Sequence, residues 1–153
     1  MSFQNDVEQT AGLEHAYRPG KQALRPADQN KVDAIATRRL AGSADIDAAL
    51  ENLRPNENRW DYVVGWATKE KSEFLYWIEV HSASGAGAVR EILDKLTWLK
   101  GWLDGEGNRL RNYRRKIVWI ASGKSAFQQN SPQLKRLVAA GVYFAGGHYT
   151  IAD

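Results

Sequence analysis

Two predicted strands joined by a short polar link occupy residues 60–83, which read WDYVVGWATKEKSEFLYWIEVHSA. The segments Trp60–Ala67 and Phe74–Ala83 are rich in the aromatic and β-branched residues that favour strands. The link, residues 68–72, is short enough to make the two strands an antiparallel hairpin. Because both segments are apolar almost without interruption, we expect the hairpin to be covered on both of its faces.

The clearest predicted helix follows the hairpin, over Gly85–Leu103. Its apolar residues recur at the i, i+3, i+4, i+7 spacing of a buried helix face, beginning at Val89. A short apolar segment, Ile117–Ala121, then predicts a buried strand. Since a helix between two neighbouring strands of one sheet leaves them parallel, we expect this strand to lie beside Phe74–Ala83.

The rest of the chain predicts further helices and one more strand. We expect helices over Lys31–Leu40, from Ser43 or Asp45 to Leu53, and over Pro132–Ala140, and a closing strand over Val142–Ile151. Residues 1–28 are polar and interrupted by glycine and proline, which indicates an N-terminal arm or an extended strand that wraps the domain. Residues 29–153 are expected to form one domain. This order of elements predicts the α/β class, with a mixed central β-sheet flanked by helices.

Positive charge is concentrated in the last third of the chain. The net charge is +3, and residues 107–153 carry eight Lys or Arg residues but a single acid, Asp153. A dense basic cluster opens this part and is formed by Arg109, Arg111, Arg114, Arg115 and Lys116. Such a cluster attracts polyanions, of which nucleic acid is the commonest. The alternative is a solvated basic loop beside a strand.

The composition excludes several classes of site. The chain has no cysteine, so disulfides, thiolate zinc sites and cysteine nucleophiles are all absent. This composition fits a cytoplasmic protein. No apolar stretch approaches the roughly 18 residues that a membrane span requires. We therefore expect no membrane partner.

Two acidic residues interrupt the predicted hairpin, Asp61 in its first strand and Glu79 in its second. A carboxylate in such an apolar strand is unfavourable unless it is paired, protonated or bound to a cation. The two acids can converge at one end of the sheet, where they could hold a hard divalent cation. The structural alternative is a surface ion pair for Asp61, and a buried arginine or a helix amide as the partner of Glu79.

This pattern resembles the PD-(D/E)XK nuclease superfamily, whose core runs helix, three strands, helix, strand. The resemblance covers roughly residues 31–121 and rests on the strand residue Asp61, on Glu79-Val80-His81, and on the long helix that follows. It implies a restriction-endonuclease-like fold and magnesium-dependent hydrolysis of phosphodiesters. By this resemblance Asp61 and Glu79 are catalytic acids and the ligands of Mg²⁺ or Mn²⁺.

His81 stands where the superfamily motif usually has lysine. That lysine orients or activates the attacking water and stabilises developing charge. A neutral imidazole can exchange a proton or bind metal, but it supplies no permanent cation. Some members of the superfamily take the lysine from the following helix, where Lys95 borders the apolar stripe and Lys100 lies nearer its other side. Lys95 is the preferred candidate, and a surface lysine directed to solvent is the alternative.

The resemblance therefore implies a metal-dependent nuclease, with Asp61, Glu79, His81 and Lys95 as catalytic residues and the basic cluster as the nucleic-acid contact. The alternative is a catalytically inactive protein of the same fold that acts as a nucleic-acid-binding or protein-interaction module. The missing lysine motivates this second hypothesis.

Two further groups have open roles at this point. Asp45, Asp47 and Glu51 are candidates for an additional metal ligand, or they form a solvated helix face. Trp98 and Trp102, spaced i, i+4, are core residues or the seam of a homodimer.

Overall fold

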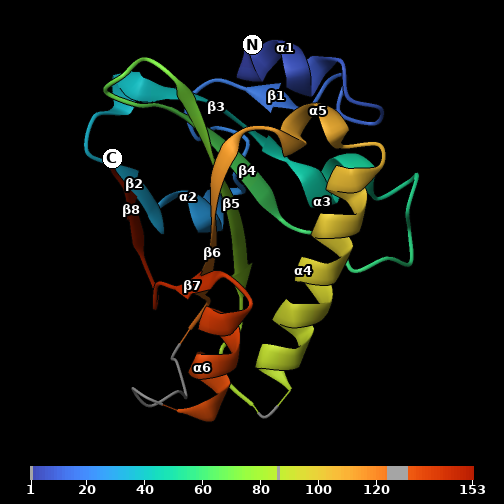
Figure 1. Cartoon of the computed structure of the whole chain (residues 1–153), viewed down its shortest axis with the longest axis vertical. Coiled ribbons are helices and arrows are strands. Elements are labelled where there is room, and N and C mark those ends of the chain that lie inside the picture. The colour runs from blue at the N-terminus through green and yellow to red at the C-terminus, as the bar shows by residue number, and fades with distance from the viewer. Residues whose placement is uncertain (1, 86, 124–130) are drawn as a thin grey trace.

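A six-stranded mixed sheet lies at the centre of the structure, a computed structural model that describes residues 2–85, 87–123 and 131–153 (Figure 1). Its strands lie in the order β1 (Tyr17–Arg18), β3 (Leu40–Asp45), β4 (Tyr62–Ala67), β5 (Glu73–His81), β6 (Arg114–Ala121) and β7 (Val142–Phe144). The first four pair antiparallel, and β6 and β7 continue the sheet parallel to β5. The predicted α/β class with a mixed central sheet is confirmed.

Strands β4 and β5 are the expected antiparallel hairpin, with Val63 opposite Trp77. The turn closes through a hydrogen bond of 2.8 Å from the Thr68 N–H to the Ser72 carbonyl. Lys71 adopts a positive φ of 63° within it. Almost all of β4 and the middle of β5 are buried, as near-continuous apolar strands predict.

Helix α4 (Ala88–Asp104) connects β5 to β6, and these two strands lie parallel and adjacent as predicted. The helix begins at Ala88, later than expected, because Gly85 has a φ of +94° that a right-handed helix does not accept. Its buried face includes Val89, Ile92, Leu96, Leu99 and Leu103. Among the described helices, this one included, none combines the length and apolar character that crossing a membrane requires.

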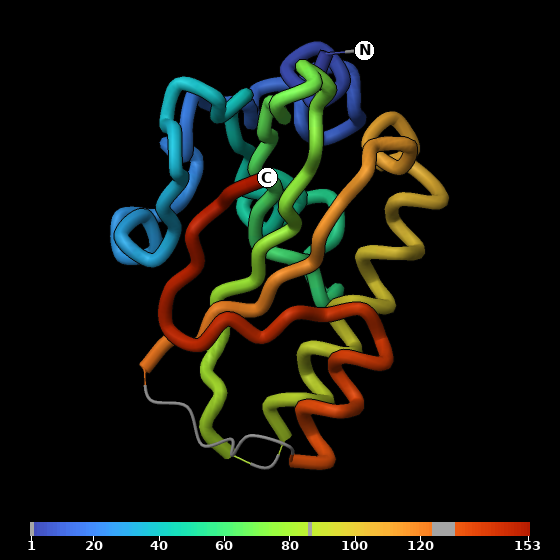
Figure 2. The backbone as a smooth tube through the Cα atoms, turned by 60° about the vertical axis from the view of Figure 1, so that its left-hand side comes forward, coloured from blue at the N-terminus to red at the C-terminus, as the bar shows by residue number. Residues whose placement is uncertain are grey.

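Helices cover one face of the sheet, and a small second sheet covers the other (Figures 1 and 2). On the first face α4 is joined by α1 (Phe3–Glu8), α3 (Ile46–Leu50), α5 (Asn108–Arg111) and α6 (Pro132–Ala139). On the second face β2 (Val32–Ala34) pairs in parallel with β8 (Tyr149–Ile151), and the short helix α2 (Pro26–Gln29) lies beside β2. The two faces have separate hydrophobic cores, one around Trp77 and one around Tyr62.

The helix predicted over Lys31–Leu40 is wrong. Its residues form β2, a 3₁₀ turn η1 (Thr37–Arg39) and the first residue of β3. The apolar spacing does not define a buried helix face, since Val32 is buried but Ile35 is 59% exposed. Strand β2 is held by β8 from the far end of the chain, and a local pattern carries no sign of such a pairing.

Helix α3 is shorter than the helix predicted from Ser43 or Asp45 to Leu53. Asp45 caps it, because its Oδ1 accepts the Ala48 N–H at 2.8 Å. Ser43 instead lies buried in β3 and accepts the Ala23 N–H. Strand β3 is therefore a central strand that the sequence pattern did not predict.

Of the last two predicted elements, the helix is confirmed and the single strand is wrong. Helix α6 matches the prediction, and Ser131 caps it by accepting the Leu134 N–H at 3.2 Å. The single closing strand expected over Val142–Ile151 is two strands, β7 and β8, which belong to different sheets. Gly146, with a φ of +73°, lies in the turn between them.

The N-terminal segment that we expected to be a polar arm is folded against the sheet. Phe3, Val7 and Leu13 are fully buried in the helix-covered core, and Leu24 lies in the other core. The Phe3 ring lies over Gly65 in β4, where a Cβ atom would come within 2.9 Å of it. These few buried apolar side chains thus hold a largely polar segment against the sheet. The division into an arm and a domain at residue 28 stays a prediction.

Candidate functional site

Asp61 and Glu79, hereafter the acid pair, meet where β4 begins and β5 ends. Asp61 directly precedes β4, and the register that pairs Tyr62 with Ile78 sets it beside Glu79. Asp61 is 6% exposed and Glu79 is fully buried. Each carboxylate accepts a backbone N–H from the other strand: Glu79 Oε1 from Asp61 at 3.1 Å, and Asp61 Oδ2 from Val80 at 3.0 Å. The hairpin therefore brings the two predicted acids together.

Lys95 reaches the acid pair from α4, between the buried residues Ile92 and Leu96. Its Nζ lies 2.6 Å from Glu79 Oε2, and its side chain is only 20% exposed. The lysine that we preferred on this helix therefore contacts the second acid and is not directed to solvent. Lys100, the other lysine considered, is exposed.

His81 lies two residues beyond Glu79, on the same face of β5. Its Nδ1 is 3.8 Å from Glu79 Oε2, and its Nε2 is 2.5 Å from Glu91 Oε2 on α4. The side chain is 26% exposed. His81 thus forms the solvent-facing edge of the site, oriented by a second carboxylate, where it can exchange protons with a ligand or with water.

Burial dominates the electrostatics of the acid pair. Burial and the Asp61 charge raise the pKa of Glu79 and Lys95 opposes the rise, so that the pKa lies at about 8. Burial also raises the pKa of Asp61, against the influence of Lys95 and of the Val80 N–H. For Lys95, burial lowers the pKa, but the Glu79 carboxylate outweighs burial and the pKa lies above its usual value. The site therefore favours either a bound proton or additional positive charge.

Next to the acid pair, two arginines form ion pairs with Asp47 in α3 and with Asp45, the residue that caps this helix. Arg25 contacts Asp47 at 2.9 Å and Asp45 at 3.5 Å, and Arg59 contacts Asp47 at 3.0 Å. Glu51, at the end of the helix, is exposed. The candidates for a further metal ligand are thus paired with arginine or turned to solvent.

Asp61 and Glu79 offer the carboxylate oxygens that a hard divalent cation prefers, and three of these four oxygens accept hydrogen bonds from the protein. Mg²⁺ is commonly bound by one or two carboxylates, and water and substrate phosphates complete its coordination. Within residues 2–85, 87–123 and 131–153, no three His, Asp or Glu side chains are grouped so as to enclose a metal ion. A divalent cation held by the acid pair would therefore occupy an open site, to which Lys95 already contributes one positive charge.

The predicted basic cluster is divided and lies away from the acid pair. In the register of β5 and β6, Arg114 pairs with Phe74, whereas Trp119 pairs with Glu79. These positions are five residues apart on each strand, or about 16 Å. Because side chains alternate along a strand, Arg114 and Lys116 share the face of Phe74, opposite to Glu79.

The other three arginines of the cluster lie on α5 and at the start of β6, where they make local contacts. Arg109 lies 4.0 Å from Asp6, and Arg111 lies 3.5 Å from Asp104. Arg115 donates a hydrogen bond of 3.0 Å to the Arg111 carbonyl. The five basic residues therefore do not form one surface beside the acid pair.

Trp98 and Trp102 stack on each other along α4, with ring centroids 5.8 Å apart. Trp102 is buried and contacts Trp77 edge-on, at 6.1 Å between centroids. Trp98 is half-buried and donates its Nε1–H to Glu57 at 2.7 Å. Trp102 is thus a core residue, so any homodimer seam here would rest on Trp98.

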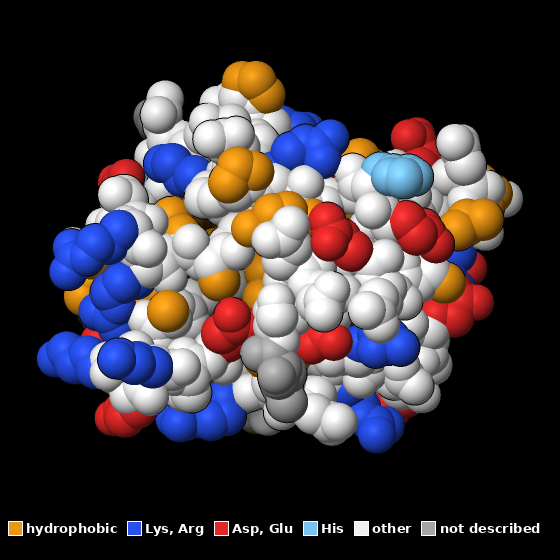
Figure 3. All heavy atoms as spheres, turned by 90° about the horizontal axis from the view of Figure 1, so that it is seen from above, with side chains coloured by type: hydrophobic (Ala, Val, Ile, Leu, Met, Phe, Trp, Pro, Cys, Tyr) orange, Lys and Arg blue, Asp and Glu red, His pale blue; other side chains and the backbone are white. Residues whose placement is uncertain are grey.

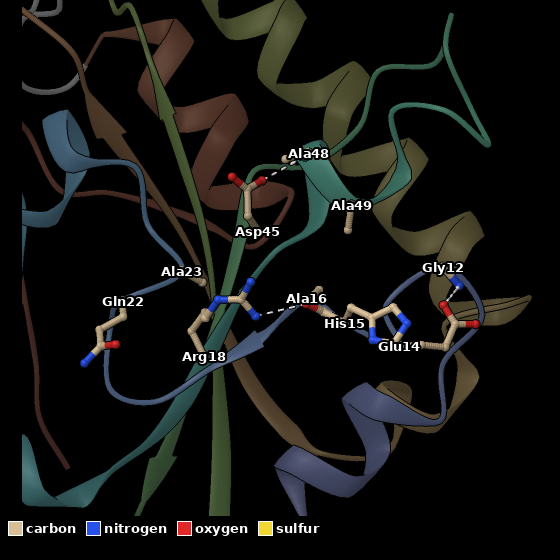
Figure 4. Close-up of a pocket in the computed structure, with 10 residues that line it drawn as sticks. All are labelled: Gly12, Glu14, His15, Ala16, Arg18, Gln22, Ala23, Asp45, Ala48 and Ala49. Atoms are coloured by element: carbon tan, nitrogen blue, oxygen red, sulfur yellow. Dashed lines mark hydrogen bonds between the residues drawn. The ribbon is translucent and has the colours of Figure 1, made fainter.

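A surface pocket of about 390 Å³ adjoins the cap of α3 (Figure 4). The loops on either side of β1 line it together with the first turns of α3. Its charged side chains serve local structure: Arg18 donates to the His15 carbonyl at 2.9 Å, and Glu14 accepts the Gly12 N–H at 3.0 Å. Asp45 is the helix cap. Because these three side chains already form hydrogen bonds within the protein, they are not free to bind a ligand in the pocket.

Two residues near the acid pair were not predicted. Glu91 had a signal in the sequence, because it lies four residues before Lys95 and helical periodicity places both on one face. Arg25 had none, since it belongs to the segment expected to be an arm. Both add charge around the acid pair.

Comparison with known protein families, with curated proteins and with solved structures gives no match to this chain. The fold defines its class, a mixed α/β protein with a buried acid pair at one end of the sheet. What the site does must follow from its own residues.

Proposed function

We propose that the chain is a metal-dependent nuclease that hydrolyses nucleic-acid phosphodiester bonds at Asp61, Glu79 and Lys95. The observation that carries the proposal is the 2.6 Å contact between Lys95 Nζ and Glu79 Oε2. The contact places a lysine beside the acid pair, although His81 holds the position where the motif has its lysine. The three side chains come from the residue that precedes β4, from β5 and from α4. The element order is β3, α3, β4, β5, α4, α5, β6. Apart from the short helices α3 and α5, it follows the three strands, helix and strand of the PD-(D/E)XK core and so supports the proposal.

Each residue has a role that its surroundings favour. Asp61 and Glu79 would hold Mg²⁺ or Mn²⁺, which when bound activates water and shields the charge of the phosphate. Lys95 keeps its proton beside Glu79 and supplies a permanent cation next to the reacting phosphate. His81, hydrogen-bonded to Glu91, accepts or returns a proton at the exposed edge of the site.

The test is a cleavage assay on single- and double-stranded DNA and RNA in Mg²⁺ or Mn²⁺. The double variant Asp61→Asn with Glu79→Gln keeps the side-chain shapes and should lose cleavage, and Lys95→Met should lower the rate at least about a hundredfold. Glu51→Gln, a charge change at an exposed position near the site, is the matched control and should cleave normally. Unchanged cleavage by the double variant would rule out the proposal.

A second candidate is a catalytically inactive nuclease-fold protein that binds nucleic acid or another protein. The Lys95–Glu79 contact also favours this candidate, because a buried carboxylate already paired with lysine needs no metal for its stability.

Metal-linked stability separates the two candidates. An ion that binds only the folded state stabilises it by RT ln(1 + c/Kd), where c is the ion concentration, so the melting temperature rises as this concentration exceeds Kd. The nuclease should melt higher in millimolar Mg²⁺ or Mn²⁺, and Glu79→Gln should abolish the rise. The inactive protein should show no rise in either form.

A further inference from the structure

A groove of about 560 Å³ lies on the face of the sheet opposite to the acid pair. Residues of β4, β5, β6 and β8 line it, together with the β4–β5 turn and the C-terminal residues. Its lining includes four aromatic side chains, three cations and two acids: Trp66, Phe74, Tyr76 and Tyr149, with Lys69, Arg114 and Lys116, and Glu70 and Asp153. The volume falls in the range of small-molecule sites, about 300–1,000 Å³.

The cations of the groove rest on aromatic rings. Lys116 Nζ lies 4.3 Å from the ring centroid of Tyr143 and 5.1 Å from that of Tyr149. The Arg114 guanidinium lies 5.8 Å from the Phe74 centroid. Such contacts hold a cation in place and leave its charge available to an anion.

No acid in the described ranges forms an ion pair with Lys69, Arg114 or Lys116 within 4.0 Å. The nearby carboxylate of Asp153 is engaged elsewhere, 2.5 Å from Arg39 and 3.0 Å from Trp66 Nε1. Figure 3 shows Lys and Arg side chains on the left of this end of the molecule, with acidic side chains among them. The groove therefore holds three cations against two acids, and among the described residues Arg114 and Lys116 form no ion pair within 4.0 Å.

The aromatic rings form a continuous surface beside this charge. The centroids of Phe74 and Tyr76 are 5.1 Å apart, and those of Tyr76 and Tyr149 are 5.9 Å apart. The Tyr76 hydroxyl is used internally, since it donates to the Ala152 carbonyl at 2.6 Å. What Phe74 and Tyr149 present to a ligand is therefore mainly ring surface, and both are half-buried.

We propose that this groove binds a nucleotide, with the base against Phe74 and Tyr149 and the phosphate at Arg114 and Lys116. Every base has a flat π-face that stacks on aromatic rings, and Arg and Lys bind phosphate. The shared chemistry is a base carrying a phosphate, whether the ligand is a free mononucleotide or one unit of a single strand. The groove lies on the other face of the sheet from the acid pair, so this site is separate from the proposed nuclease centre.

The test is calorimetric titration of the whole chain in EDTA, so that no cleavage accompanies binding. The probes are a mononucleotide, inorganic phosphate and a single-stranded oligonucleotide of eight thymidines. We expect the mononucleotide to bind at least about tenfold more tightly than phosphate, because stacking adds to the charge contact. An oligonucleotide that binds no more tightly than the mononucleotide identifies a free nucleotide as the ligand. Tighter, salt-sensitive binding of the oligonucleotide identifies a strand.

Variants connect the binding to the groove. Lys116→Met and Tyr149→Leu should each weaken mononucleotide binding about tenfold or more, while Tyr149→Phe, which keeps the ring, should bind normally. Lys100→Met, on the opposite face, is the matched control. Melting curves verify that each variant is folded, and Lys116→Met tests the site even if Tyr149→Leu does not fold. Mononucleotide binding weaker than roughly 1 mM, or equal binding by Lys116→Met and the parent, would overturn the proposal.

Discussion

Glu79 and Lys95 were each identifiable in the sequence, but for unrelated reasons. Glu79 breaks an apolar strand, where a carboxylate is unfavourable unless it is compensated. Lys95 borders the apolar stripe of the following helix. Their contact depends on how α4 packs across β5, which no local pattern encodes. The arginines around Asp47 could not be predicted for the same reason, because Arg25 comes from a segment with no periodic pattern.

Removing Lys95 should destabilise the fold in a pH-dependent way. Lys95→Met leaves a fully buried carboxylate without its cation, and breaking such a pair lowers the free energy of unfolding by about 3 kcal/mol. Because the pKa of Glu79 is about 8 with Lys95 present, the loss should be largest near pH 9, where the parent's Glu79 is ionised, and smaller near pH 5, where Glu79 is protonated and needs no cation. Urea denaturation at both pH values measures it, with the exposed Lys100→Met as control. Equal losses at the two pH values would contradict the assignment of Glu79 as the group left uncompensated.

Glu79 should also impose a pH dependence on the parent protein. Its pKa is raised from 4.5 to about 8 by burial and by Asp61, so the folded state binds more protons than the unfolded state between these values. The free energy of unfolding should therefore fall as the pH rises from about 4.5 to about 8. Glu79→Gln removes the titrating group and should flatten this slope. If the Glu79→Gln variant kept the parent slope, the effect would have to come from other groups.

Among the elements, those with strong local periodicity were predicted and those held by distant partners were not. Strands β4 and β5 and helices α4 and α6 have clear patterns and lie where expected. A helix was predicted at strand β2 because the apolar residues in and around it recur at helical spacing. The strand is held by β8, which lies at the far end of the chain. Strand β3 was hidden by its small residues Ala41, Gly42 and Ser43, which signal a turn more than a strand.

Helix α1 shows that amino-acid composition alone can fail to identify a helix that packs into the core. If residues 1–28 formed an arm that does not pack on the domain, which is one of the two expected alternatives, changing Phe3 would have no effect on stability. Phe3 is instead fully buried against Gly65, and its N–H donates to Glu73 at 2.6 Å. Phe3→Ala should therefore lower the free energy of unfolding by about 3–5 kcal/mol, whereas Gln4→Ala, at the exposed next position, should change it by less than about 0.5 kcal/mol. Urea denaturation of both variants decides between a packed helix and an arm.

In the whole molecule, the sheet separates two cores and the two candidate sites. The acid pair lies on the face covered by α4, and the aromatic groove lies on the face covered by β2 and β8. Strands β4, β5 and β6 place side chains on both faces, because side chains alternate along a strand. The same strand β5 thus supplies Glu79 to one site and Phe74 to the other. A ligand in the groove would touch none of the proposed catalytic side chains.

This separation predicts that the two cores contribute to stability independently. Ile92→Val in the helix-covered core and Ile151→Val in the other each remove one buried methyl group, which lowers the free energy of unfolding by about 0.5–1.5 kcal/mol. Because the two sites lie on opposite sides of the sheet, the double variant should lose the sum of the single losses within about 0.5 kcal/mol. Ile78→Val with Ile151→Val, both in the second core, is the comparison pair. An interaction above about 1 kcal/mol between Ile92 and Ile151 would mean that the sheet couples its faces, so that occupancy of the groove could alter the acid pair.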